Sequence, residues 1–271
     1  MKGLLNTEWL KLRKYPAFWW MTGIIALSYP GVNYIFYQIY QQVIGKGGTT
    51  GQMVKMLVGN PFTFPEVWHT VAYASSLFIF IPSVVVIMFI TNEYTYKTHR
   101  QNIIDGWSRK QFITSKLIDV LLLTVLITGL YLLVALVLGL FNNGESTATI
   151  WTGSKYIGLF ALQAFSQLSI AFLIAFLVRK AFVSLGIFIF YFIILEPVIV
   201  GIAKVKANDI GRFMPLEISD RLVPVPAFLA RLGETSYKAS LAAINSHIIY
   251  TLVLTTLIWV LCFRINSRRD L

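Results

Sequence analysis

Long stretches of this chain are apolar and almost free of charge, and this feature restricts the fold more than any other. A helix needs roughly 20 apolar residues to cross the hydrocarbon core of a bilayer. Only two charged residues, Asp119 and Glu196, interrupt the stretches that meet this requirement. The predicted spans are about 17–40, 69–91, 117–141, 156–178, 181–203 and 244–263. Isolated strands would leave backbone groups unpaired in lipid. The sequence therefore predicts an all-α polytopic membrane protein with six transmembrane helices, and residues 1–271 form a single transmembrane domain.

The composition agrees with lipid as the solvent. Hydrophobic residues make up 56% of the chain and charged residues only 13%, whereas soluble proteins carry about 25% charged residues. The net charge of +11 comes from short basic clusters between the apolar stretches. Such clusters are typical of the inner face of a membrane, so we expect membrane lipid and no nucleic acid as a partner.

Lysine and arginine are unevenly distributed between the two sides of the predicted membrane. Of the 23 basic residues, 14 lie in four short segments, 1–16, 92–116, 179–180 and 264–271. The others are spread over three longer segments, 41–68, 142–155 and 204–243. Because cytoplasmic loops carry an excess of basic residues, the first set is predicted to face the cytoplasm. Six spans then place both termini in the cytoplasm.

The first 16 residues have the pattern of an amphipathic helix. Leu5, Trp9 and Leu12 recur at helical spacing, and lysines occupy the rest of the surface. This pattern predicts a helix that lies in the membrane interface and ends at Pro16. The alternative interpretation is a basic flank to the first span.

The cytoplasmic segment 92–116 is amphipathic and rich in mixed charge. Asp105 and Gly106 are predicted to divide it into two short helical pieces, and Ser108 is placed to cap the second piece. A loop with this much pattern indicates a docking element. The alternative is an ordinary solvated loop.

The order of residue types in this loop carries a family resemblance. An acidic residue ends the second span, a threonine, an arginine, a turn, a Ser-Arg pair and an aromatic residue follow, and a lysine begins the third span. These residues are Glu93, Thr98, Arg100, Asp105, Gly106, Ser108, Arg109, Phe112 and Lys116. The segment resembles the first cytoplasmic loop of permease subunits of type-two ATP-binding-cassette exporters. Lys97 departs from the family, which often has glycine before the threonine, so the local turn has room to differ.

The resemblance implies a mechanism and a set of partners. The loop would be a coupling element seated on a separate ATPase subunit, and two ATPases would work with two permeases, identical or paralogous. ATP and Mg²⁺ would be bound by the partner ATPase. No segment of this chain matches the phosphate-binding pattern G-x-x-x-x-G-K-[ST], so no cofactor and no enzymatic activity are expected of the chain itself.

Two polar positions in the fourth and fifth spans are candidates for a role in transport. Glu196, followed by Pro197, predicts a broken helix, and Glu196 either shapes an external gate or pairs with Lys204 or Lys206. Re-entrant helices are expected in the external segment 204–243. The other position is a pair of glutamines on one helix face, which either line a cavity or bond neighbouring helices; the pair is Gln163 and Gln167.

Other classes of membrane protein fit the sequence less well. The histidines His69, His99 and His247 lie in separate segments, so no zinc site or intramembrane hydrolase is predicted. A secondary transporter usually has coupling charges or internal repeats within its spans. It stays the alternative, together with a membrane protein that works without an ATPase. The aromatic, charge-poor spans favour an amphipathic cargo, and the resemblance implies a bacterial cytoplasmic membrane.

Overall fold

The computed structural model describes residues 16–45, 59–104, 106–142, 150–206, 209–226, 229 and 234–268. Every regular element among these residues is a helix, so the all-α prediction is confirmed for them. The interfacial helix predicted over 1–16 lies outside the described residues apart from Pro16, where helix α2 begins. That helix therefore stays a prediction.

The described helices follow the apolar stretches closely, and shorter elements lie between them. In chain order they are α2 (Pro16–Gly45), α4 (Val67–Ser76), α5 (Phe80–Thr95), α6 (Thr98–Ile104), α7 (Arg109–Asn142), α8 (Lys155–Val178), α9 (Ala181–Phe190), the π-helix η1 (Tyr191–Leu195), α10 (Glu196–Val205), the 3-10 helix η2 (Asp209–Phe213), α11 (Pro215–Asp220) and α12 (Glu234–Arg268).

Four helical segments are long and apolar enough to cross a membrane. They are Arg109–Asn142, Lys155–Val178, Ala181–Val205 and Tyr237–Arg268. The pair α4 and α5, bent by 47°, forms a fifth if it is one span. Helix α2 covers the first predicted span and has no charged residue, but its serine, asparagine, glutamine and tyrosine side chains make it less apolar. The structure thus supports four or five spans, and the sixth stays a prediction.

The predicted span over 69–91 is broken, which the apolar pattern did not indicate. Helix α4 ends at Ser76 and α5 begins at Phe80. Pro82 accounts for the position of the break, because proline has no N–H group and its ring clashes with the carbonyl group four residues earlier. That carbonyl belongs to Phe78, between the two helices.

Helix α8 lies at the centre of the bundle. It packs against α4, α5, α7, α9, α11 and α12. Its most apolar stretch is 61% buried, whereas the same measure is 17–28% for the other three candidate spans. A helix that is buried on most sides places its polar side chains against protein, and this decides where Gln163 and Gln167 find their partners.

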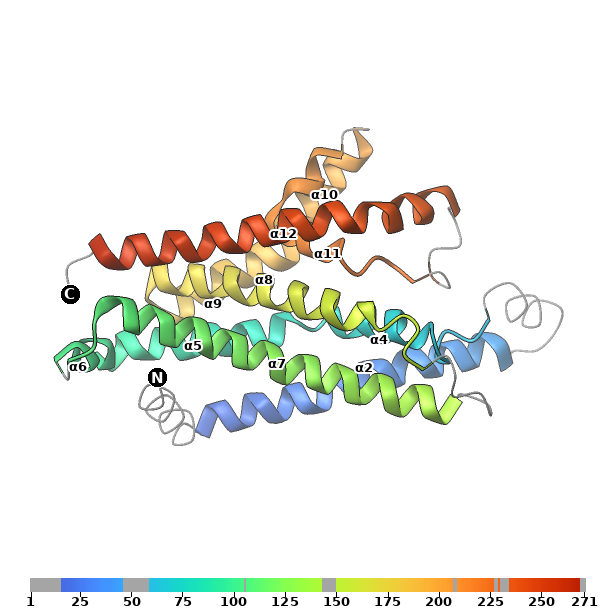
Figure 1. Cartoon of the computed structure of the whole chain (residues 1–271), viewed down its shortest axis with the longest axis horizontal. Coiled ribbons are helices and arrows are strands. Elements are labelled where there is room, and N and C mark those ends of the chain that lie inside the picture. The colour runs from blue at the N-terminus through green and yellow to red at the C-terminus, as the bar shows by residue number, and fades with distance from the viewer. Residues whose placement is uncertain are drawn as a thin grey trace.

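The bundle has two distinct ends (Figure 1). The beginning of α2, the short helix α6 and the end of α12 lie at one end of the long axis. The end of α2 and the beginning of α12 lie at the other. We call these the α6 end and the far end. The segment between α5 and α7, with which the resemblance is concerned, is thus next to both described ends of the chain.

The predicted break at Glu196 and Pro197 is present as a change of helix type. The π-helix η1 ends at Leu195, and α10 continues from Glu196 away from the bundle (Figure 1). The wider turn of a π-helix accommodates the Pro197 ring next to the carbonyl group of Ile193. Beyond α10, η2 and α11 turn back, and α11 packs against α8 and α12.

Candidate functional site

The segment between α5 and α7 is a compact helical corner. Lys97 has φ 56°, so it adopts the left-handed conformation that a glycine at this position would favour. Helix α6 follows directly, and Gly106, with φ 97°, lies in the turn before α7. Asp105 lies outside the described residues. The predicted division at Asp105 and Gly106 is therefore seen as α6 on one side and the beginning of α7 on the other.

A buried ion pair joins the two helices that flank this corner. The ammonium nitrogen of Lys116 on α7 lies 2.7 Å from Oε1 of Glu93 on α5, and both side chains are 5% exposed or less. Asp119 contributes a second carboxylate, 3.4 Å from the same nitrogen, so the predicted pairing of Asp119 with Lys116 is present. The Phe89 ring lies 4.5 Å from the ammonium group. Such a pair fixes α5 and α7 relative to each other.

The beginning of α7 is capped and is bonded to the end of α12. Ser108 Oγ accepts a hydrogen bond from the Gln111 N–H group, and Gln111 Oε1 accepts one from the Ser108 N–H group. This reciprocal arrangement is a capping box, as expected for Ser108. The Arg109 guanidinium group donates to the Ser267 carbonyl oxygen at 3.0 Å, and the Asn266 side chain donates to the Arg109 carbonyl oxygen at 2.8 Å.

The residues singled out in this corner divide into buried and exposed sets. Phe112 is 5% exposed and belongs to the core, and Thr98 donates to the Glu93 carbonyl oxygen at 3.5 Å. Arg100 is exposed. Sequence reasoning missed its two apolar neighbours, Tyr96 at 71% exposure and Ile104 at 83%. A large apolar residue beside basic residues on a short amphipathic helix was the signal available for both.

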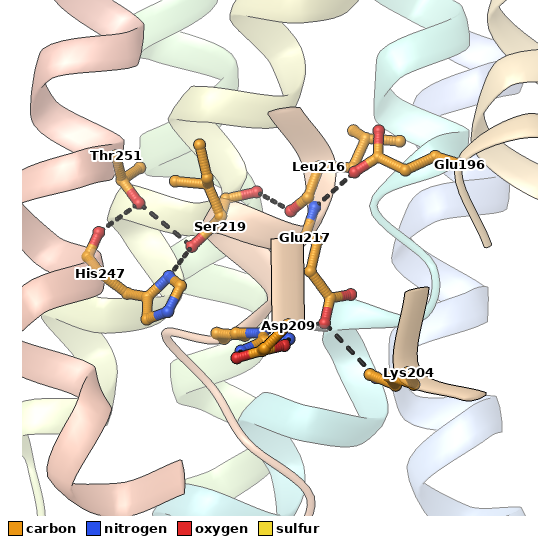
Figure 2. A network of polar contacts seen from close by, with 10 residues as sticks. Glu196, Lys204, Asp209, Leu216, Glu217, Ser219, His247 and Thr251 are labelled. Atoms are coloured by element: carbon orange, nitrogen blue, oxygen red, sulfur yellow. Dashed lines mark hydrogen bonds and ion pairs between the residues drawn. The ribbon is translucent and has the colours of Figure 1, made fainter. Parts of the chain in front are cut away.

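Glu196 holds the start of α11. Its Oε1 accepts a hydrogen bond of 2.6 Å from the Glu217 N–H group (Figure 2). A carboxylate at the N-terminus of a helix is stabilised by the unpaired N–H groups and the helix dipole. The structure contradicts the alternative of a pair with Lys204 or Lys206, because Lys204 instead lies 3.5 Å from Glu217.

The two glutamines of α8 hold the other end of α11. Gln163 and Gln167 donate to the same oxygen, Oδ1 of Asp220, at 2.9 Å and 2.6 Å. Gln163 is 1% exposed and Gln167 is fully buried. Protein surrounds the Asp220 side chain, yet much of its surface is open to a cavity. Desolvation by the surrounding protein raises the pKa of Asp220 to about 7, and the carboxylates of Glu217 and Glu196 act in the same direction.

An arginine joins η2 to α11 beside this carboxylate. Arg221 forms a two-point contact with Asp209, with nitrogen–oxygen distances of 2.7 Å and 2.9 Å. It also donates to Glu217 at 2.9 Å. The hydrogen bonds from Arg221 hold the pKa of Asp209 below its usual value. The charges of Asp209, Glu217 and Arg221 therefore compensate one another.

Histidines from two other helices bind the same external segment. His247 on α12 donates from Nδ1 to the Ile218 carbonyl oxygen at 3.1 Å, and Thr251 donates to the same oxygen at 3.4 Å (Figure 2). His69 on α4 donates to the Pro224 carbonyl oxygen at 2.7 Å. The segment 209–226 is thus bonded to α4, α8, α10 and α12, and it belongs to the bundle instead of forming a separate loop.

A cavity of about 1280 Å³ lies between these elements. Gln163, Glu196 and Pro197 are part of its wall, while Gln167 is covered by protein. Asp220 and Arg221, which sequence reasoning did not single out, are also at the wall. The sequence held no signal for them, because they lie in a charged external segment with no apolar periodicity.

Helices of this length and hydropathy, packed around a buried central helix, define a multi-pass membrane protein. Residues 4–195 match the family described as ABC-2 family transporter protein. The chain therefore belongs to this family, whose members are membrane components of ATP-binding-cassette transporters, and it is a permease. The matched range contains the α5–α7 corner and both glutamines, and it ends one residue before Glu196. A comparison with curated proteins gave no match.

Proposed function

We propose that this chain is the membrane-spanning permease subunit of an ATP-driven exporter, with the segment 92–116 as its docking element for a separate ATPase. ATP and Mg²⁺ would then be bound by that ATPase. Two permeases, identical or paralogous, would form the translocation path as a dimer. Closure of the ATPases would tilt the helices that flank each corner.

The observation that carries this proposal is the rigidity of the corner together with its exposed face. The Glu93–Lys116 pair and the bonds between Arg109, Asn266 and Ser267 fix α6 to three long helices. Tyr96, Arg100 and Ile104 are meanwhile left on the surface. An element that transmits force needs both features, because a flexible tether would move without tilting the helices.

The proposal also includes the orientation. Six spans, with α2 as the first, and an amphipathic helix over 1–16 would place both termini and the α6 end in the cytoplasm of a bacterial cell. The basic excess at the α6 end supports this arrangement. The position of the two described chain ends beside α6 supports it as well (Figure 1).

Copurification tests the proposal. The tagged chain is solubilised from its native membrane, and bound proteins are identified by mass spectrometry. We expect an ATP-binding-cassette ATPase to copurify with the wild type and to be lost from the double variant Arg100→Glu, Ile104→Asp. Arg109 is left unchanged because its bond to Ser267 makes it part of the permease fold.

The matched control makes the same two changes elsewhere. The double variant Arg212→Glu, Ile210→Asp alters an exposed arginine and an exposed isoleucine in η2, away from the α6 end. It should retain the ATPase. If no ATPase copurifies with the wild type under conditions that preserve other membrane complexes, a secondary transporter or a permease without an ATPase becomes the better account.

We further propose that Glu196 and Pro197 shape an external gate. The support is the π-helix before Pro197, the contact of Glu196 with α11 and the position of both residues at the cavity wall. A Glu196→Gln variant that assembles with the ATPase should transport more slowly. Normal assembly with unchanged transport would contradict the gate.

A further inference from the structure

The wall of the cavity contains one carboxylate that no basic residue balances. Among the described residues, neither a lysine nor an arginine forms an ion pair with Asp220, and its hydrogen bonds come only from the amides of Gln163 and Gln167. Both bonds end on Oδ1. The other oxygen, Oδ2, accepts no hydrogen bond from the described part of the chain.

The two bonds to Asp220 also fix the direction of the amides. Because each amide nitrogen faces the carboxylate, each amide oxygen points away from it. The Oε1 atoms of Gln163 and Gln167 are buried and have no hydrogen-bond partner among the described residues. A buried acceptor without a donor costs free energy, about 1–3 kcal/mol in mutational measurements. At Gln163 this acceptor belongs to a side chain of the cavity wall.

The basic residues of the wall are already engaged. Arg221 is bonded to Asp209 and Glu217, and Lys204 lies near Glu217 with 60% of its side chain exposed. Arg212 lies over the Phe213 ring. The cavity therefore presents a free carboxylate oxygen and a free amide oxygen to a ligand, and this combination selects a cation that donates hydrogen bonds.

The size and remaining walls of the cavity exclude a bare metal ion as its natural occupant. A volume of about 1280 Å³ is far larger than an ion requires, and the described residues contain no group of three metal-ligating side chains. Tyr73, Phe192 and Tyr237 add aromatic surface to the wall. Aromatic faces bind both apolar groups and cations.

From these observations we propose that the cavity binds the primary ammonium group of an amphipathic amine, with the ammonium group on Asp220 and the amide oxygen of Gln163 and the apolar part against the aromatic wall. The three N–H donors of such a group match the acceptors that the wall leaves open. The same chemistry is found in soluble amines and in the headgroup of phosphatidylethanolamine. The inference rests on the proposed export function only in naming the class of cargo.

Binding is measured on the full chain in nanodiscs of phosphatidylcholine, whose headgroup has no N–H donor. The probe is 2-phenylethylammonium, followed by saturation-transfer NMR, and 2-phenylethanol is the neutral analogue. We expect saturable binding of the amine and at least about tenfold weaker binding of the alcohol, because a charge-assisted hydrogen bond is lost. Asp220→Asn, which keeps an acceptor for both glutamines, should weaken the amine about tenfold or more.

Two further variants separate the site from general effects on charge and fold. Asp209→Asn makes the same chemical change at the wall, at a carboxylate that Arg221 already balances, and should leave amine binding within about twofold of the wild type. Gln163→Leu removes the open amide oxygen and should weaken the amine. Unfolding temperatures show that each variant is folded.

A second arm identifies the source of the ammonium group. Adding phosphatidylethanolamine to the nanodiscs displaces the probe if the lipid headgroup is the ligand, and leaves it bound if a soluble amine is. Equal binding of the amine by wild type and Asp220→Asn, or equal binding of amine and alcohol, overturns the site. Because no ATPase takes part, such a failure leaves the copurification result, and the proposed function, unaffected.

Discussion

Lys97 has a backbone conformation that side chains other than glycine adopt at a cost. At φ 56° the Cβ atom lies close to the following carbonyl group, which costs roughly 1–2 kcal/mol. Lys97→Gly removes this strain but gives the unfolded chain more freedom. We expect a net increase in stability of up to about 1 kcal/mol, measured as a higher unfolding temperature in detergent.

The control for Lys97 separates charge from conformation. Lys97→Ala removes the charge and keeps the strain, so its stability should stay near that of the wild type. Lys97→Val should lose about 1 kcal/mol or more, because a β-branched residue fits the left-handed region poorly. A valine variant as stable as the glycine variant would contradict the strain at this position.

The Glu93–Lys116 pair should respond unequally to loss of its two partners. Lys116→Met leaves Glu93 and Asp119 without their cation and is expected to cost about 3–5 kcal/mol. Glu93→Gln should cost less, because Asp119 remains 3.4 Å from the lysine. Denaturant unfolding of both variants measures the difference. The double variant should recover part of the loss, and a larger cost for Glu93→Gln than for Lys116→Met would refute this order.

At the scale of elements, α11 is too short to be stable without its contacts. It has six residues, whereas isolated helices shorter than about 12–15 residues are marginal in water. Glu196→Ala removes the acceptor at its start, and a lost cap costs about 0.5–2 kcal/mol. We expect hydrogen exchange of the α11 amides to become several-fold faster. Glu196→Gln keeps an oxygen acceptor and should lie between alanine and wild type.

The apolar stretches were sufficient to predict most of the long helices. Charge-free runs of this length have few alternatives in lipid, and α7, α8 and α12 follow them closely. The bend between α4 and α5 was missed because both pieces are apolar, so hydropathy does not register the effect of Pro82. The spacing of Gln163 and Gln167 placed them on one helix face. Their partner, Asp220, is more than 50 residues away, and no local pattern connects them.

The corner between α5 and α7 shows a similar division. The Ser108 cap and the pairing of Asp119 with Lys116 follow from local spacing, and both are present. Phe112 and Arg109 were expected to serve docking, but the structure places Phe112 in the core and Arg109 on the end of α12. Burial and contacts across more than 150 residues depend on the tertiary arrangement, which residue order alone does not determine.

For the whole molecule, Asp220 predicts an unusual dependence of stability on pH. An unfolded aspartate titrates near 4, whereas enclosure by protein raises the pKa of Asp220 to about 7 in the folded chain. Between these values the folded state holds more protons than the unfolded state. Stability should therefore fall as the pH rises from about 4 to about 7. Unfolding temperatures of the wild type and Asp220→Asn across this range should diverge, with the flatter profile in the variant.

Asp209 provides the control for this profile. The hydrogen bonds from Arg221 lower the pKa of Asp209, so its contribution is lost only as the pH falls below its unfolded value near 4. Asp209→Asn should therefore keep the slope of the wild type between pH 4 and 7. A wild-type profile that rises with pH over this range would contradict the enclosure of Asp220.

Helix α12 is bonded at two distant places to two different parts of the permease. Near its end, Asn266 and Ser267 are bonded to Arg109 at the α6 corner, and farther back, His247 and Thr251 are bonded to Ile218 of α11. About 28 Å of continuous helix separates the two sets of bonds. The helix acts as a connecting rod: a push on the corner at one face of the membrane arrives at the cavity as displacement of α11, with no joint between them in which the stroke is lost.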